Sequence, residues 1–89
     1  TNRGIVTRVW VQGAAITAEI DAAGNLIRFT WAGQTHAVQI IANHWRVDVN
    51  WWRLRLWRDY FKLTTDTGLL VIVYHDLVDG AWYVQRLYD

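Results

Sequence analysis

The residue types most able to do chemistry gather in one stretch near the middle of the chain. Four of the seven tryptophans fall between positions 45 and 57, and arginines are interleaved with them. Aromatic rings stack on nucleobases and guanidinium groups contact phosphates, so this mixture is typical of a surface for single-stranded nucleic acid. Trp, Tyr and Arg are also enriched at the hot spots of protein–protein interfaces. The candidate binding residues are Trp51, Trp52, Arg53, Arg55, Trp57, Arg58 and Lys62.

The same tryptophans could instead fill the core of a small β-domain. The chain has 89 residues, enough for one domain, and no cysteine that could form a disulfide. A buried aromatic side chain removes about 150–250 Å² from water and so compensates for a small core. The sequence leaves the choice between core and binding surface open.

The charge balance weakens the nucleic-acid interpretation. The formal net charge is only +1, whereas domains that depend on phosphate contacts usually carry a larger basic excess. The basic residues are concentrated between positions 44 and 62, however, and the acids outside that stretch lie mostly near expected turns. The chain could therefore present one basic face.

No set of residues indicates catalysis, a metal site or a cofactor. Serine and cysteine, the two commonest nucleophiles, are absent. His36, His44 and His75 are too far apart in sequence for the usual metal-ligand spacing, and we expect them on the surface or in hairpins. The six glycines are isolated and are explained by turns rather than by a phosphate-binding loop. We expect a non-enzymatic protein without cofactor or metal.

One polar pair has a structural explanation. Asp59 precedes Phe61 and Leu63 at alternate positions, which places it on the same side of a strand as two apolar residues. A partly buried carboxylate needs a cationic partner, and we expect Arg46 or Arg86 to form an ion pair with Asp59.

Turn residues divide the chain into short apolar runs. Gly and Asn at residues 22–25, Gly at 32–35 and 65–68, and Asp-Gly at 77–80 separate segments rich in β-branched and aromatic residues, which favours β-hairpins. Gly13 is expected to end the first strand, and residues 14–21 fit a strand better than a helix. The expected strands are residues 5–12, 14–21, 26–31, 36–41, 60–64, 69–75 and 81–88.

The Trp-rich middle allows two structures. Trp52, Leu56 and Tyr60 recur at helical spacing, whereas Leu54 and Leu56 alternate with arginines as in a strand. We favour a strand with a turn, because the rest of the chain is β. In either structure Arg53 and Arg55 should be exposed to solvent.

These elements predict one all-β domain over residues 1–89. We expect a five- or six-stranded antiparallel meander curled into a small SH3-like or open barrel, with one short helix as the alternative for the middle segment. In the last strand, alternation puts Trp82, Val84, Arg86 and Tyr88 on one face. The expected core consists of Val9, Val11, Ile27, Phe29, Val38, Ile40, Leu70, Ile72, Val84 and several tryptophans.

Several motifs in residues 26–89 are familiar in combination. They are the double Trp at 51–52, the run Arg-Asp-Tyr-Phe at 58–61 and the ending Trp-Tyr-Val-Gln-Arg-Leu-Tyr-Asp at 82–89. In these features the chain resembles the DUF6504-like small bacterial domain family of unassigned function, and the Trp-rich C-terminal tail of inactive Y-family polymerase homologues of bacterial mutasomes. The resemblance implies a bacterial binding module connected with DNA repair or translesion synthesis, and no catalytic residues.

Two functions follow as hypotheses. The first is a protein-interaction module, which could also bind a second copy of itself. The alternative is a module for single-stranded nucleic acid that uses tryptophan stacking and arginine–phosphate contacts. No apolar run reaches the length of a membrane span, so we expect no membrane partner, and the lack of cysteine is compatible with a reducing, cytoplasmic location.

Overall fold

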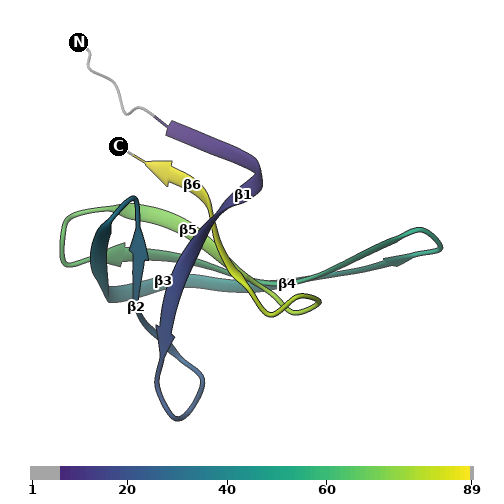
Figure 1. The fold of residues 1–89 in the computed structure, drawn as a ribbon, viewed down its shortest axis with the longest axis horizontal. Helices are drawn as coiled ribbons and strands as arrows, with labels where there is room; N and C mark the ends of the chain where they lie inside the picture. The colour runs from purple at the N-terminus through teal and green to yellow at the C-terminus, as the bar shows by residue number, and fades with distance from the viewer. Residues whose placement is uncertain (1–6, 89) are drawn as a thin grey trace.

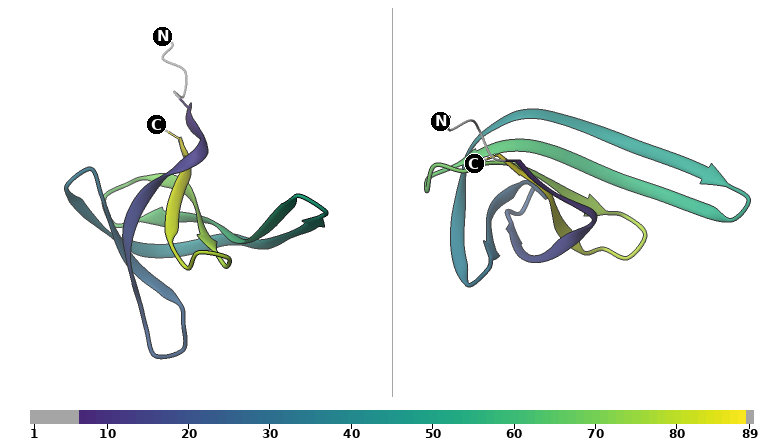
Figure 2. Two further views of the ribbon diagram at one scale, coloured as in Figure 1. Left: turned by 45° about the vertical axis from the view of Figure 1, so that its right-hand side comes forward. Right: turned by 90° about the horizontal axis from the view of Figure 1, so that it is seen from above.

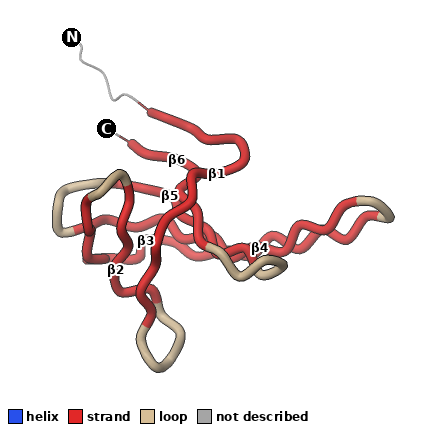
Figure 3. Tube along the Cα trace, in the orientation of Figure 1, coloured by secondary structure: helices blue, strands red, loops and turns tan. Residues whose placement is uncertain are grey.

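Six β-strands make up the fold (Figures 1 and 3). The structure, a computed structural model, describes the backbone of residues 7–88 and the side chains of residues 13–88. Within residues 7–88 there is no helix of the length and apolar character needed to cross a membrane. The strands are β1 (Thr7–Ile20), β2 (Leu26–Trp31), β3 (Gln34–Trp51), β4 (Leu54–Thr65), β5 (Leu70–Asp76) and β6 (Trp82–Tyr88).

The strands form a closed antiparallel barrel in the order of the chain. Each strand pairs with the next, and β6 returns to pair with β1. This arrangement confirms the predicted all-β antiparallel meander. The Trp-rich middle is a hairpin of β3 and β4 rather than a helix, as the strand interpretation predicted.

The first strand continues where the sequence predicted a break. β1 includes Gly13, and its register against β6 shifts between Val9 and Ala14, in a strand that bends sharply (Figure 1). Gly13 has φ +78°, and an added Cβ would lie 2.6 Å from the Tyr74 hydroxyl. Glycine therefore allows the strand to bend closely over the tyrosine instead of ending it. The first two residues of the predicted strand 5–12 lie outside the described residues.

The β2–β3 hairpin closes more tightly than predicted. Its turn consists of Ala32 and Gly33 alone, both with positive φ (52° and 77°), which is the backbone of a type I′ turn. Gln34 and Thr35, expected in the turn, already pair with β2. The turn therefore directs the chain straight into the long strand β3.

The barrel interior contains a compact apolar core. Among the predicted core residues, Phe29 and Val84 are fully buried, and Val38 packs against them. Leu70 is half-buried, and Ile72 is buried in a separate cluster. The core comprises Leu26, Phe29, Leu63, Val71, Val73, Val84 and Leu87.

Ile27 and Ile40 were wrongly assigned to the core, because their strands contain bulges. Ile27 is 37% and Ile40 61% exposed. In β2, Leu26 and Arg28 pair with consecutive residues of β1, so Ile27 is the extra residue and the alternation of faces shifts. In β3 the register shifts once between Val38 and Ile40, and a second time before Asn43.

The same effect changes the faces of β6. Ile72 and Val73 are consecutive in β5 but pair with Arg86 and Val84, so Gln85 is the extra residue. Val84 and Leu87 are consequently both buried, whereas strict alternation predicted opposite faces for them.

Tryptophan contributes little to the barrel core. Of the six tryptophans with described side chains, none belongs to the buried core, and Trp31 and Trp82 pack against it half-buried. The prediction of several core tryptophans was wrong, and Val9 and Val11 lie outside the described side chains.

A second cluster covers the outer face of β4, β5 and β6. Trp45, Tyr60, Tyr74 and Tyr83 lie opposite one another on four adjacent strands. Successive ring centroids are 5.3, 5.2 and 5.0 Å apart, within the range of favourable aromatic pairs. Gly13 of β1 lies over Tyr74, so this ladder is closed on one side by β1.

His36 lies in the β2–β3 hairpin, one of the two predicted locations, but it is buried there rather than exposed. Its side chain is only 3% exposed, its ring lies 5.4 Å from that of Phe29, and its Nδ1 lies 2.5 Å from the Thr67 hydroxyl. The Thr65 and Thr67 hydroxyls are 2.9 Å apart. The buried polar groups of this cluster are thus hydrogen-bonded to one another, as is usual inside a folded protein. The cluster therefore has a structural explanation beside the apolar core.

Candidate binding surface on the projecting arm

Part of the β3–β4 hairpin extends beyond the barrel (Figures 1 and 2). The first residue of β4 that pairs with β5 is Arg58, opposite Asp76. Residues 48–57 therefore form a ribbon of only two strands, which we call the arm. Its tip is a turn at Trp52 and Arg53, flanked by the pair Trp51 and Leu54.

The two faces of the arm differ in chemistry. Opposite residues in an antiparallel pair share a face, and successive residues alternate between faces. The pairs Trp51–Leu54 and Val49–Leu56 thus lie on one side, which we call the apolar face. Asp48, Asn50, Arg55 and Trp57 lie on the other side, the polar face.

The apolar face is open to solvent. Trp51 is 64%, Leu54 50% and Val49 38% exposed, and Trp52 in the adjoining turn is 75% exposed. The face continues at the base into Val47, which packs against the outer aromatic cluster. Large apolar groups left in water at a protruding position are typical of a contact surface, because burying them is favourable.

The charges of the polar face are paired. Arg55 forms an ion pair with Asp48. At the base of the arm, Arg46 donates two hydrogen bonds to the Asp59 carboxylate, at 2.7 and 3.0 Å, and His44 Nε2 lies 3.6 Å from the same carboxylate. The hydrogen bond from Arg46, together with the charge of its guanidinium, lowers the pKa of Asp59 despite partial burial. The predicted ion pair of Asp59 is therefore confirmed, with Arg46 as the partner.

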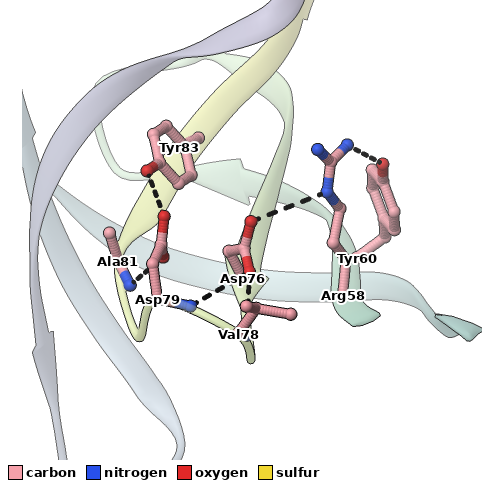
Figure 4. Close-up of polar contacts among 7 residues, drawn as sticks. All are labelled: Arg58, Tyr60, Asp76, Val78, Asp79, Ala81 and Tyr83. Atoms are coloured by element: carbon pink, nitrogen blue, oxygen red, sulfur yellow. Dashed lines mark hydrogen bonds and ion pairs between the residues drawn. The ribbon is translucent and has the colours of Figure 1, made fainter. Parts of the chain in front are cut away.

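Arg58 anchors the arm to the barrel (Figure 4). Its guanidinium donates to the Tyr60 hydroxyl at 3.2 Å, lies 4.5 Å from the centre of the Tyr74 ring, and has Nε 3.9 Å from the Asp76 carboxylate. Burial by itself would lower the pKa of Arg58, but these neighbours outweigh it and raise the pKa. Only 19% of the Arg58 side chain is exposed, and its contacts join β4 to β5.

The β5–β6 turn beside Arg58 is held by two carboxylates (Figure 4). Asp76 accepts from the Val78 amide at 2.8 Å, while Asp79 accepts from the Ala81 amide and from the Tyr83 hydroxyl, both at 2.7 Å. The amide hydrogen bond, followed by the tyrosine, lowers the pKa of Asp79. These carboxylates are occupied by the turn itself.

The structure separates the seven candidate residues. Trp51, Trp52 and Arg53 lie at the tip, where the Arg53 guanidinium stacks 4.2 Å from the Trp52 ring. Arg55 and the half-buried Trp57 share the polar face, with the guanidinium 5.0 Å from the indole.

Arg58 and Lys62 lie on the other side of β4 from the polar face, the same side as Leu54 and Leu56. The Lys62 ammonium lies 5.5 Å from the Tyr88 ring, on the barrel. The cations are thus not gathered on one side. As predicted, Arg53 and Arg55 are exposed.

Three residues of the apolar face were not among the predicted site residues: Val49, Leu54 and Leu56. Their signal is present in the sequence, because apolar residues alternate symmetrically on both sides of Trp52 and Arg53. The signal requires the turn to be placed first, and the competing helical spacing obscured it.

The described part of the chain has no other obvious site. Residues 13–88 enclose no pocket, and they hold no group of three or more His, Cys, Asp and Glu side chains suited to a metal ion. Comparison of the chain with protein-family models, curated proteins and solved structures gives no match. The resemblance to the DUF6504-like family and to polymerase-homologue tails therefore stays a prediction, as does the connection with DNA repair.

Proposed function

We propose that the domain is a non-enzymatic protein-interaction module whose contact surface is the apolar face of the arm. The observation that carries this proposal is the exposure of Trp51 and Leu54, opposite one another on a two-stranded ribbon that projects from the barrel. Because the backbone of the arm is already paired, it loses less conformational freedom on binding than an unstructured segment would, so more of the gain from burying these side chains remains as affinity.

The distribution of charge supports a protein partner. On the polar face Arg55 is compensated by Asp48, and at the base Arg46 is compensated by Asp59. The apolar face itself carries no charged residue between Val49 and Leu56 except Arg53 in the turn. Such a surface offers an apolar centre with a polar margin, the usual anatomy of a protein interface.

One observation favours single-stranded nucleic acid as the second candidate. Trp52 is 75% exposed, and the Arg53 guanidinium lies over its ring. A base could stack on such a ring, and a phosphate could accept from the guanidinium. Against this candidate, Arg58 and Lys62 lie away from the tip and contact tyrosine rings of the barrel.

A comparative capture experiment tests the protein-interaction proposal. The wild-type domain is compared with Trp51→Glu/Leu54→Glu, and with Ile20→Glu/Ile27→Glu as a control that places two charges on exposed apolar positions of the barrel. Proteins captured in quantitative mass spectrometry should be lost with the arm variant and kept with the barrel variant. Loss of the same proteins with both variants would contradict the proposal.

A titration separates the two candidates. A labelled single-stranded oligonucleotide is titrated with wild type and with Arg53→Ala/Arg55→Ala at low and moderate salt. On the protein-interaction proposal, anisotropy stays unchanged. Binding that weakens with added salt and with the double variant would replace the proposal with the nucleic-acid function.

A further inference from the structure

One edge of the long strand β3 has no neighbouring strand over most of its length. Along one edge, β3 pairs with β4 from Val38 to Trp51. Along the other edge it pairs with β2 only as far as Ala37. Within the described strands β3 contacts no element besides β2 and β4. The backbone of residues 38–51 therefore presents a free edge, which can accept another strand.

The two halves of this edge differ in regularity. Near the barrel, register shifts after Val38 and after Ile41 interrupt the ladder, and such bulges hinder pairing with another chain. From Asn43 to Trp51 the register is uninterrupted. This half contains no proline and no lysine, two residue types that commonly protect edges. The regular half is the part able to pair.

We propose that a second copy of this chain pairs antiparallel along this edge, with Val47 of one copy opposite Val47 of the other. The inference goes beyond the proposed function, because it uses the backbone edge of β3 rather than the apolar face, and either can fail alone. Two identical edges related by a two-fold axis form a closed dimer.

Charge complementarity selects this register. With Val47 at the axis, Arg46 of each copy lies opposite Asp48 of the other. Both side chains are 54% exposed and can reach across. On the polar face, the facing residues across the four-stranded sheet would then be Asp59, Arg46, the second copy's Asp48 and its Trp57. The second copy's Arg55, which forms an ion pair with Asp48, lies in the next pair on that face. Opposite charges in facing positions stabilise a sheet, and like charges destabilise it.

The neighbouring registers are unfavourable. Residues that face each other must lie on the same side of the sheet. Any other register must therefore still pair odd-numbered residues with odd-numbered residues and even-numbered with even-numbered ones. A centre at Arg46 places two arginines opposite each other, and a centre at Asp48 places two aspartates opposite each other. The centre at Val47 also brings Trp45 beside Val49 of the other copy, which extends the apolar face over four strands.

A cysteine scan tests the register directly. The chain has no cysteine, so an introduced thiol is its sole thiol. Val47→Cys would lie opposite itself at about 4.5–5.5 Å between Cα atoms, within the range of a disulfide. In the matched control Val49→Cys, the two thiols would be about 13 Å apart along the strands. Mild oxidation should cross-link the first variant and not the second. Equal cross-linking of both, or none of the first, would overturn the register.

Charge exchange between copies tests the electrostatics. Arg46→Asp alone faces Asp48, and Asp48→Arg alone faces Arg46, so each variant should self-associate roughly tenfold or more weakly than wild type in analytical ultracentrifugation. An equal mixture restores both opposite pairs and should form the heterodimer. Arg53→Asp, the same charge change in the turn, should leave self-association unchanged.

These outcomes separate the dimer from simple clustering of the apolar faces. Wild type that remains monomeric at all concentrations, or a mixture that associates no better than the single variants, would refute the paired edge. Circular dichroism of each variant establishes that the barrel is intact, because Arg46→Asp also removes the partner of Asp59. If that variant is unfolded, the cysteine pair decides alone.

Discussion

The barrel and the arm are made from similar residues but differ in what covers them. In the barrel, strands with bulges turn Leu26, Phe29 and Val84 inward until they are buried. In the arm, a regular ribbon keeps Val49 and Trp51 on one face with nothing over them. The same apolar side chain therefore stabilises the fold in one region and is available for contacts in the other. Irregular strands close the core, and the regular ribbon leaves an open surface.

The comparison predicts its largest effect in the barrel core. Phe29→Ala removes a fully buried ring and should lower the free energy of unfolding by about 3–5 kcal/mol, through lost burial and the cavity left behind. Urea denaturation followed by circular dichroism measures this loss. A change below about 1 kcal/mol would mean that the core collapses around the missing ring and that the barrel does not depend on tight packing.

A second prediction concerns the bend in β1. Gly13→Ala and Gly24→Ala both place a side chain at positive φ, but only at Gly13 does the new Cβ meet another residue, the Tyr74 hydroxyl at 2.6 Å. The Gly13 variant should therefore be less stable than the Gly24 variant by about 1–3 kcal/mol. Thermal unfolding of the two variants in one buffer gives the difference. Equal stability would show that β1 does not pack closely against Tyr74 of the outer aromatic cluster.

The third prediction is a pH dependence at the junction of the two regions. The pKa of Asp59 is lowered in the folded state, so its contribution to stability is complete above the unfolded value of about 3.9 and is lost as pH falls through the folded pKa. Asp59→Asn should cost about 1 kcal/mol at neutral pH, the scale of an ion pair whose arginine is exposed. The difference from wild type should shrink below pH ~4 in urea titrations, whereas a constant difference would exclude the Arg46 pair as its cause.

The smallest effect on stability is expected at the tip of the arm. Trp51→Ala should change the free energy of unfolding by no more than about 0.5 kcal/mol, because the side chain is 64% exposed. The same variant should lose a large share of the tryptophan fluorescence that iodide quenches. A substantial loss of stability would place Trp51 in a packed environment and remove the distinction between arm and barrel.

The strands could be predicted because their boundaries depend on local chemistry. Gly33 with Ala32, the Asp-Gly pair at Asp79 and the alternating runs between them suffice to define hairpins. The bulges could not be predicted in the same way, since an extra residue is fixed by how neighbouring strands fit together. One bulge in β2 and one in β6 were enough to misplace Ile27 and to hide the burial of Leu87.

The candidate site was predicted in type but not in arrangement. The sequence indicates that Arg53 and Arg55 are exposed and that Asp59 needs a cation, because these follow from solvation. It does not indicate that β4 extends beyond the end of β5, because the strand lengths depend on how the strands pair in the barrel. Only that difference in length leaves Trp51 and Leu54 without a third strand beside them.

The closure of the barrel has a consequence for the order of folding. Among the six described strands, every pairing joins neighbours in the chain except β1 with β6. The hairpins need short loops, whereas Val9 meets Arg86 only after almost the whole chain has been brought together. Contacts between distant segments form late. We therefore expect the β1–β6 pairing to form last and to open first, and its backbone amides should exchange with deuterium before those of β4 and β5.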